Sequence, residues 1–235
     1  MTRSVSEEKL RTSSLTRRVC VRGRVMIGTN LGPGEYLGRV KCELDRLNMD
    51  EVRRFSDAVF ESYESGRFVF LCGNGGSGSN ASHMCEDLGK GTIHREDYTN
   101  DAKRRLKVLS LTDNTPYILA WANDEGYDRV FVEQLKNLAS PGDLLVAISG
   151  SGNSPNVLRA VEWANSHELR TFGLTGFGGG KLRHLSQQGL HVAIDDMGIV
   201  ESIHLTVFHW VLDNLYSRIS GTVPESELQF EVKQD

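Results

Sequence analysis

The sequence lacks several features that mark particular classes of protein. None of its apolar runs approaches the length of a membrane-spanning helix, so the chain is not predicted to cross a bilayer. It has no surplus of basic residues, since 27 Lys and Arg stand against 31 Asp and Glu for a net charge of -4. A nucleic acid partner requires excess positive charge. We therefore expect neither a membrane nor a nucleic acid as a partner.

Cysteine is also scarce. The four cysteines show no CxxC spacing, which argues against a structural zinc knot and favours buried, reduced thiols at Cys20, Cys42, Cys72 and Cys85. The sequence also lacks a secretory hydrophobic segment. The expected location is therefore a reducing cytoplasm.

Length and composition predict one folded domain with loose ends. The chain has 235 residues, 39% hydrophobic and 25% charged, which suits one well-buried domain better than two. Residues 1–34 read as a basic leader, and residues 220–235 as a flexible tail, leaving the domain over 35–219. For the N-terminal leader we favour a mobile segment. The alternatives are a targeting peptide and a true translation start at Met26.

Strand-like and helix-like segments alternate along the core. The predicted strands are 67–72, 107–111, 143–148, 170–174 and 191–194. The predicted helices are 35–65 with a break at 48–50, then 79–89, 116–123, 130–138, 155–166 and 199–219. This alternation predicts an α/β fold with N-terminal helices: three αβα layers around a doubly wound, five-stranded parallel sheet. Ligands gather at the carboxyl ends of such strands.

Two glycine- and serine-rich segments follow predicted strands and open predicted helices. They are Asn74-Gly75-Gly76-Ser77 and Ser149-Gly150-Ser151-Gly152-Asn153-Ser154. Glycine lets backbone N–H groups approach an anion, serine hydroxyls add donors, and a helix directs its positive end to the same place. We expect the two loops to converge on one phosphorylated small molecule, without a nucleotide cofactor. The alternative, two ordinary turns, is weaker because the loops are paired in placement.

Two predicted helices carry titratable side chains at helical spacing. His83 and Asp87 are four residues apart, and Glu201 and His209 are eight apart, slightly more than two turns. Two imidazoles and two carboxylates are therefore expected to meet beside the ligand. Such groups move a proton between adjacent carbons through an enediol, or bind one zinc ion per subunit. His204 falls on a different face and is expected to pack or lie at the surface.

Three motifs, taken in order, resemble the sugar isomerase (SIS) domain family. They are residues 72–77 (CGNGGS), 148–154 (ISGSGNS) and 174–181 (LTGFGGGK). More narrowly, they resemble its phosphoheptose isomerase branch, which interconverts sedoheptulose 7-phosphate and D-glycero-D-manno-heptose 7-phosphate. The resemblance implies a flavodoxin-like fold, aldose–ketose isomerisation of a small phosphorylated sugar, and a homotetramer whose neighbouring subunits complete each site.

The same resemblance implies a role for each matching residue. The phosphate would be held by the loop of Ser149, Gly150, Ser151 and Ser154, and the sugar by Asn74, Gly75, Gly76, Asn123, Asp124 and Glu201. Catalysis would fall to Asp87 and His209, and metal binding to His83, Asp87, Glu201 and His209.

Two positions depart from the family pattern of His, Glu, Gln and His. Asp87 is one methylene shorter than Glu, and Glu201 brings a charge that strengthens metal binding and weakens a donor role. The site is therefore a working one with rearranged geometry, which we favour, or one with a changed substrate or activity. Other hypotheses are a non-catalytic SIS module that binds phosphosugars or associates with a replication initiator, and a metal-dependent hydrolase. His209 favours the enzyme, since the initiator-associated relative lacks that histidine.

Overall fold

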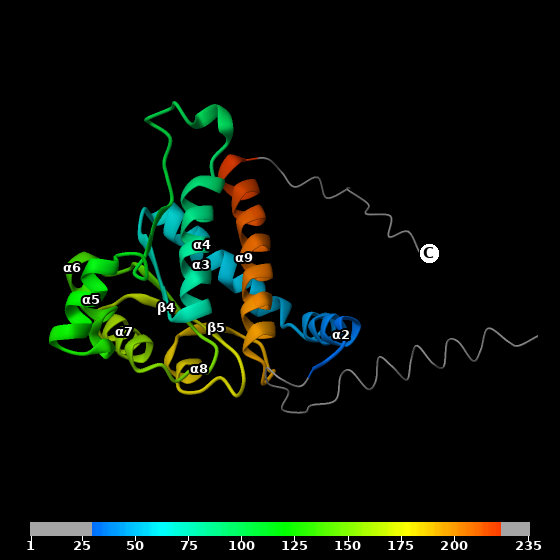
Figure 1. Cartoon of the computed structure of the whole chain (residues 1–235). Coiled ribbons are helices and arrows are strands. Elements are labelled where there is room, and N and C mark those ends of the chain that lie inside the picture. Colours follow the sequence, from blue (N-terminus) through cyan, green and yellow to red (C-terminus); the bar gives the residue numbers. More distant parts are fainter. Residues whose placement is uncertain (1–29, 222–235) are drawn as a thin grey trace, which may run out of the picture.

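A five-stranded parallel sheet organises residues 30–221, the part of the chain that this computed structural model describes (Figure 1). Its strands are β1 (Phe68–Gly73), β2 (Lys107–Ser110), β3 (Leu144–Ser149), β4 (Arg170–Thr175) and β5 (Gln188–His191). The strand order is β2-β1-β3-β4-β5. The chain therefore moves outward from β1 to β2 and then crosses back to β3, which confirms the doubly wound fold and places the switch point between β1 and β3.

Helices cover both faces of this sheet. One face carries α3 (Met49–Ser65), α4 (Gly75–Gly91) and α9 (Met197–Ser220). The other carries α5 (Thr115–Asp124), α6 (Val132–Leu138), α7 (Pro155–Ser166) and α8 (Leu182–Leu185). The N-terminal helix α2 (Pro33–Leu44) packs against the beginning of α9 (Figure 1). Two short 3-10 helices, Arg95–Asp97 and Tyr127–Arg129, lie in the connections.

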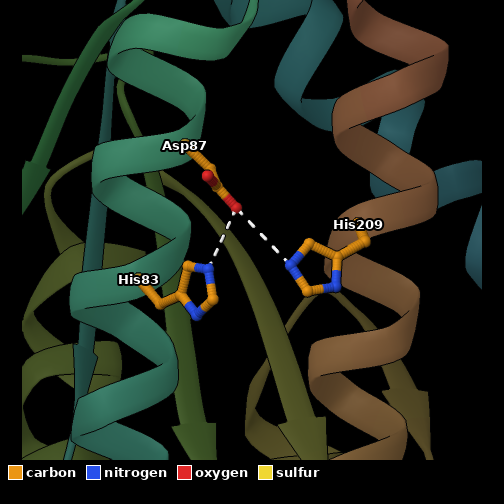
Figure 2. Close-up of side chains that lie close together, drawn as sticks. All are labelled: His83, Asp87 and His209. Atoms are coloured by element: carbon orange, nitrogen blue, oxygen red, sulfur yellow. Dashed lines mark ion pairs between the residues drawn. The ribbon is translucent and has the colours of Figure 1, made fainter.

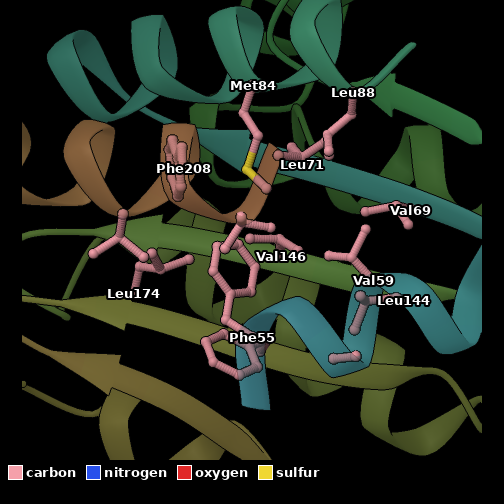
Figure 3. Packing of buried hydrophobic residues seen from close by; sticks show 14 of the residues in the cluster. Phe55, Val59, Val69, Leu71, Met84, Leu88, Leu144, Val146, Leu174 and Phe208 are labelled. Carbon is pink, nitrogen blue, oxygen red and sulfur yellow. The ribbon is translucent and has the colours of Figure 1, made fainter. Parts of the chain in front are cut away.

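The core under α4 fixes which side of that helix faces outward. Ala81, Met84 and Leu88 recur at helical spacing and are almost fully buried against the sheet. Figure 3 shows Met84 and Leu88 in this core. Phe55 of α3 stacks on Phe172 of β4 in the same cluster, with ring centroids 4.7 Å apart. Burying each such side chain contributes roughly 1.5–3 kcal/mol. This apolar stripe therefore holds α4 in one orientation, with its polar positions turned away from the sheet.

The bounds of helix α4 and strand β5 differ clearly from the prediction. Helix α4 begins at Gly75 instead of residue 79, so both glycines of the first loop belong to its first turn. Strand β5 covers Gln188–His191, and the predicted strand at 191–194 is wrong. Val192 still donates its N–H to the carbonyl oxygen of Thr175 in β4, but its side chain and that of Ile194 pack with the beginning of α9.

The predicted ends of the domain lie mostly outside the described residues. Helix α2 begins at Pro33, within the last residues of the predicted leader. Asn48 breaks the N-terminal helical region as expected, because its side chain caps α3 by accepting from the N–H groups of Asp50 and Glu51. Residues 1–29, with Met26, and residues 222–235 are not described, so the interpretations of the leader and most of the tail stay predictions.

Cysteine chemistry agrees with the prediction of reduced thiols at two described positions. Cys72 is a buried free thiol, as predicted, and Cys85 is a free thiol that is only half-buried. Cys42 is disulfide-bonded, so the expectation of a reduced thiol is wrong there. The absence of CxxC spacing excludes local pairs only and carries no information about distant ones. A cytoplasmic location stays a prediction. Over residues 30–221, no helix is both long and apolar enough to span a membrane.

Candidate active site

The first glycine loop is tied directly to the helix that follows the second loop. Asn74, at the beginning of α4, donates from Nδ2 to Oδ1 of Asn156 at 2.9 Å, and Nδ2 of Asn156 donates back to Oδ1 of Asn74 at 2.8 Å. The Tyr127 hydroxyl also donates to Oδ1 of Asn74. Asn156 is buried. This reciprocal amide pair holds the two loops together at the switch point, as the placement of the loops predicted.

The serine loop turns its hydroxyl groups toward the beginning of α7. Oγ of Ser149 lies 3.2 Å from Oγ of Ser154. Ser154 is the N-cap residue of α7, yet its side chain makes no capping hydrogen bond. Ser151 is exposed, and its Oγ accepts from the N–H of Asn153. The arrangement offers hydroxyl and backbone donors at a helix N-terminus, where an anion is favoured.

The beginning of α9 covers three loops at once. A Cβ atom added at Gly150 would overlap the sulfur of Met197, and one added at Gly76 would overlap the carboxylate of Glu201. Between them, Val200 lies against Gly176, directly after β4. One helical turn of α9 therefore closes over the carboxyl ends of β1, β3 and β4. Close approach of this helix explains glycine at these loop positions.

Glu201 places its carboxylate at the N-terminus of α4. The backbone N–H of Ser77 hydrogen-bonds this carboxylate. Partial burial raises the pKa of Glu201, and the Ser77 hydrogen bond opposes that shift. The α9 backbone is anchored nearby, because Nδ2 of Asn80 donates to the carbonyl oxygen of Glu201 at 3.0 Å. Glu201 thus faces the backbone N–H groups of the first loop.

His83, Asp87 and His209 form a separate cluster farther along α4 and α9, which run side by side (Figures 1 and 2). Oδ2 of Asp87 lies 3.3 Å from Nε2 of His83 and 3.7 Å from Nε2 of His209. The two imidazole rings meet edge to face, with centroids 5.2 Å apart. The histidine side chains are 44% and 51% exposed, so the cluster is open to a ligand from outside.

The cluster has the donor chemistry of a metal site. One ligand atom from each of the three residues lies within 4.8 Å of the other two. Two imidazole nitrogens and one carboxylate oxygen suit zinc, and three protein ligands leave a fourth position for substrate or water. The structure brings together three of the four predicted side chains. Glu201 precedes His209 by eight residues, about 12 Å along a helix, and lies apart from the cluster.

The remaining predicted site residues are Asn123 and Asp124. Asn123 and Asp124 end α5 and are exposed, with Nδ2 of Asn123 donating to Oδ1 of Asp124 at 2.7 Å. His204 is fully buried, and burial lowers its pKa to about 4, so it packs as a neutral residue, as expected. Sequence reasoning missed Asn156 and Tyr127. Only the position of Asn156, two residues after the serine loop, carried any signal.

Comparison with known proteins agrees with this arrangement. The model of the SIS domain family matches residues 35–176. A probable phosphoheptose isomerase of Thermoplasma acidophilum is 36% identical over 165 residues, which cover 70% of this chain and 87% of the relative. A phosphoheptose isomerase of Aliarcobacter butzleri is 36% identical over 171 residues, covering 73% and 87%. The structure of phosphoheptose isomerase from Neisseria gonorrhoeae superposes with a TM-score of 0.68 at 24% identity, over 91% of this chain and 100% of that one, and shares the fold.

Proposed function

Because this chain belongs to the SIS domain family and is an isomerase of the phosphoheptose isomerase type, we propose that it interconverts sedoheptulose 7-phosphate and D-glycero-D-manno-heptose 7-phosphate. The observation that carries this proposal is the joint presence of a serine loop at a helix N-terminus and an open His–Asp–His cluster on the neighbouring helices. The first is suited to hold an anion, and the second is suited to move protons.

The phosphate group would lie in the serine loop. Hydroxyl groups of Ser149, Ser151 and Ser154 would donate to its oxygens, together with backbone N–H groups around Gly150. The sugar would extend along the beginning of α4, past Asn74, Gly75 and Gly76. Asn123 and Asp124 are proposed to contact its hydroxyl groups, since their side chains are exposed and otherwise paired with each other.

Asp87 and His209 would carry out the proton transfer. His83 lies seven residues beyond Gly76, roughly 10 Å along α4, so the cluster lies well beyond the part of α4 along which the sugar would extend from the phosphate. A seven-carbon ketose phosphate extends farther toward it than a shorter sugar phosphate. One of the two groups would remove a proton from the hydroxyl-bearing carbon next to the carbonyl and deliver it to the former carbonyl carbon. The other group would exchange a proton with the oxygen atoms on these two carbons. The 3.7 Å separation between the two side chains allows both to face one substrate.

As the alternative to direct proton transfer, His83, Asp87 and His209 would hold one zinc ion, because their donor atoms and spacing fit that metal. An ion held there would supply a Lewis acid able to polarise a carbonyl oxygen. Glu201 would act on the substrate from α9, opposite the first loop, with its carboxylate accepting from a sugar hydroxyl. Its role as a metal ligand stays a prediction, since it lies apart from the three.

An isomerase assay tests the function and the phosphate site together. With sedoheptulose 7-phosphate, the wild type should yield an aldose phosphate, detected by nuclear magnetic resonance. Ser151→Ala should raise KM about tenfold or more with a smaller change in kcat, because a hydrogen bond to a charged group contributes about 1.5–3 kcal/mol. Ser217→Ala is the matched control, since its hydroxyl bonds the Asp213 carbonyl oxygen in α9, far from the loop. Binding of the sugar without turnover, with or without zinc, would favour the non-catalytic SIS module instead.

We further propose that copies of the chain assemble as a homotetramer in which a neighbour covers the open cluster. Beside His209, Trp210 is 42% exposed, and Met49 of α3 is 49% exposed. They line one largely apolar groove of about 410 Å³ between α2, α3 and α9. An apolar groove of this kind, lined on α9 by the residue that follows His209, favours a second copy as its cover.

Analytical ultracentrifugation checks the assembly. The wild type should sediment as a species four times the 26.2 kDa of one chain. Trp210→Glu should shift it toward monomer, because a charge would then have to be buried at the interface. Leu138→Glu, which changes a similarly exposed residue of α6 on the opposite face of the sheet, is the control. A monomeric wild type at micromolar concentration would contradict the proposal.

A further inference from the structure

A cleft of about 470 Å³ lies at the β5 edge of the sheet, away from the cluster on α4 and α9. β5 is the last strand in the sheet order, so no further strand pairs with its outer side within residues 30–221. The cleft extends around this edge. Glu51 and Arg54 line it from α3 on one face, and Arg183 and Ser186 line it from the α8 region on the other.

The two arginine side chains in this cleft have no partner among the described residues. Over residues 30–221, the side chains of Arg54 and Arg183 are exposed and make no hydrogen bond or ion pair. The carboxylate of Glu51 is already engaged, since it accepts from the N–H of His191 at 3.0 Å and from Nδ2 of Asn48 at 3.5 Å. Two guanidinium groups therefore face the cleft without a partner, and guanidinium is the side chain best suited to bind phosphate.

A buried hydroxyl adds a further donor to the cleft. Oγ of Ser186 is inaccessible to solvent and has no hydrogen-bond partner. It lies over Gly173 of β4, where an added Cβ atom would come within 2.5 Å of it. Leaving a buried hydroxyl unpaired costs about 1–3 kcal/mol, so rotation of the Ser186 side chain toward a group bound in the cleft is favoured. Glycine at 173, paired in register with Gly189 of β5, keeps this space free of side chains.

Arg183 also connects the cleft with the serine loop. Its side chain lies against Gly179, in the glycine-rich turn after β4. That turn rests on the serine loop, because a Cβ atom at Gly152 would overlap the carbonyl oxygen of Gly179. The N–H of Leu182 donates to the carbonyl oxygen of Gly152 at 2.9 Å. A change in the position of Arg183 would therefore be transmitted to the proposed phosphate site by direct contact.

We propose that this cleft is a second anion site, which binds a small phosphate-bearing molecule between Arg54 and Arg183 with the Ser186 hydroxyl as an additional donor. Its volume is in the range of small-molecule sites. The inference goes beyond the proposed isomerase activity and does not depend on it. The contact of Arg183 with the glycine-rich turn makes the site a means of adjusting sugar phosphate affinity from outside the catalytic site.

Isothermal titration calorimetry with inorganic phosphate, at constant ionic strength, tests the proposal on the full chain. The wild type, Ser151→Ala, Arg54→Ala and Arg183→Ala are compared. We expect a saturable binding event that survives Ser151→Ala and is weakened at least tenfold by either arginine substitution. Arg53→Ala is the matched control, since it removes the same charge one residue away, from a side chain paired with Asp50 outside the cleft.

Three results would overturn the proposal: no saturable event in Ser151→Ala, an event unaffected by the two arginine substitutions, or equal weakening by Arg53→Ala. The last would indicate general charge attraction. Arg54 and Arg183 are exposed, so the variants are expected to fold, which circular dichroism and melting curves check. This experiment measures phosphate binding and no turnover. A negative isomerase assay would therefore not affect the test of the second anion site, and a negative result here would not affect the proposed isomerase activity.

Discussion

His209→Ala should lower kcat by about 10²–10⁴-fold while changing KM much less, because general acid–base groups contribute about that factor to the rate. Nε2 of His209 lies 3.7 Å from Oδ2 of Asp87, and the imidazole is half-exposed on the open side of α9. Removing it takes away one proton carrier and leaves the serine loop and the first glycine loop unchanged. Steady-state kinetics with sedoheptulose 7-phosphate give the two constants separately.

The same variant should lose zinc. His209→Ala removes one of three donors, so the metal content after dialysis, measured by mass spectrometry, should fall well below one ion per chain. His167→Ala is the control, because that histidine is exposed and stacks on Trp163 of α7, on the opposite face of the sheet. If His209→Ala kept its full kcat, the acid–base assignment would be wrong. If it kept both kcat and its zinc, the cluster would have neither role.

The parts of this site that follow from local spacing could be predicted from the sequence. The apolar stripe of Ala81, Met84 and Leu88 fixes the inward side of α4, so His83 and Asp87 had to share the outward side. Glycine and serine after two apolar runs likewise indicated loops at the carboxyl ends of β1 and β3, where the amide pair of Asn74 and Asn156 now joins them. Each of these inferences needs only the period of one helix or strand.

Features that depend on how two elements pack could not be predicted. Spacing alone put Glu201 and His209 on one side of α9, but their heights on the helix differ by about 12 Å, so they meet different parts of α4. Glu201 faces Gly76, and His209 faces Asp87. The cleft at the β5 edge depends even more on packing, since Arg54 and Arg183 come from helices on opposite faces of the sheet. No periodicity in the chain connects residues brought together in this way.

Gly152→Ala should damage the phosphate site severely. Gly152 has a φ of +66°, which an alanine adopts only under strain, and the new Cβ atom would overlap the carbonyl oxygen of Gly179, a backbone atom that cannot turn aside. Strain and overlap of this kind each cost about 1–3 kcal/mol. Relief requires the loop and the glycine-rich turn to separate, which breaks the hydrogen bond from Leu182 N–H to the carbonyl oxygen of Gly152.

Gly178→Ala provides the comparison, because it lies in that same turn with no atom within 4 Å of the added Cβ and no left-handed φ. Urea unfolding should show a loss of roughly 2–4 kcal/mol for Gly152→Ala and almost none for Gly178→Ala. Calorimetric affinity for sedoheptulose 7-phosphate should fall more than tenfold in the first variant, since Ser149, Ser151 and Ser154 lose their common geometry. Equal stability and equal affinity in the two variants would mean that contact with the turn does not hold the serine loop in its binding shape.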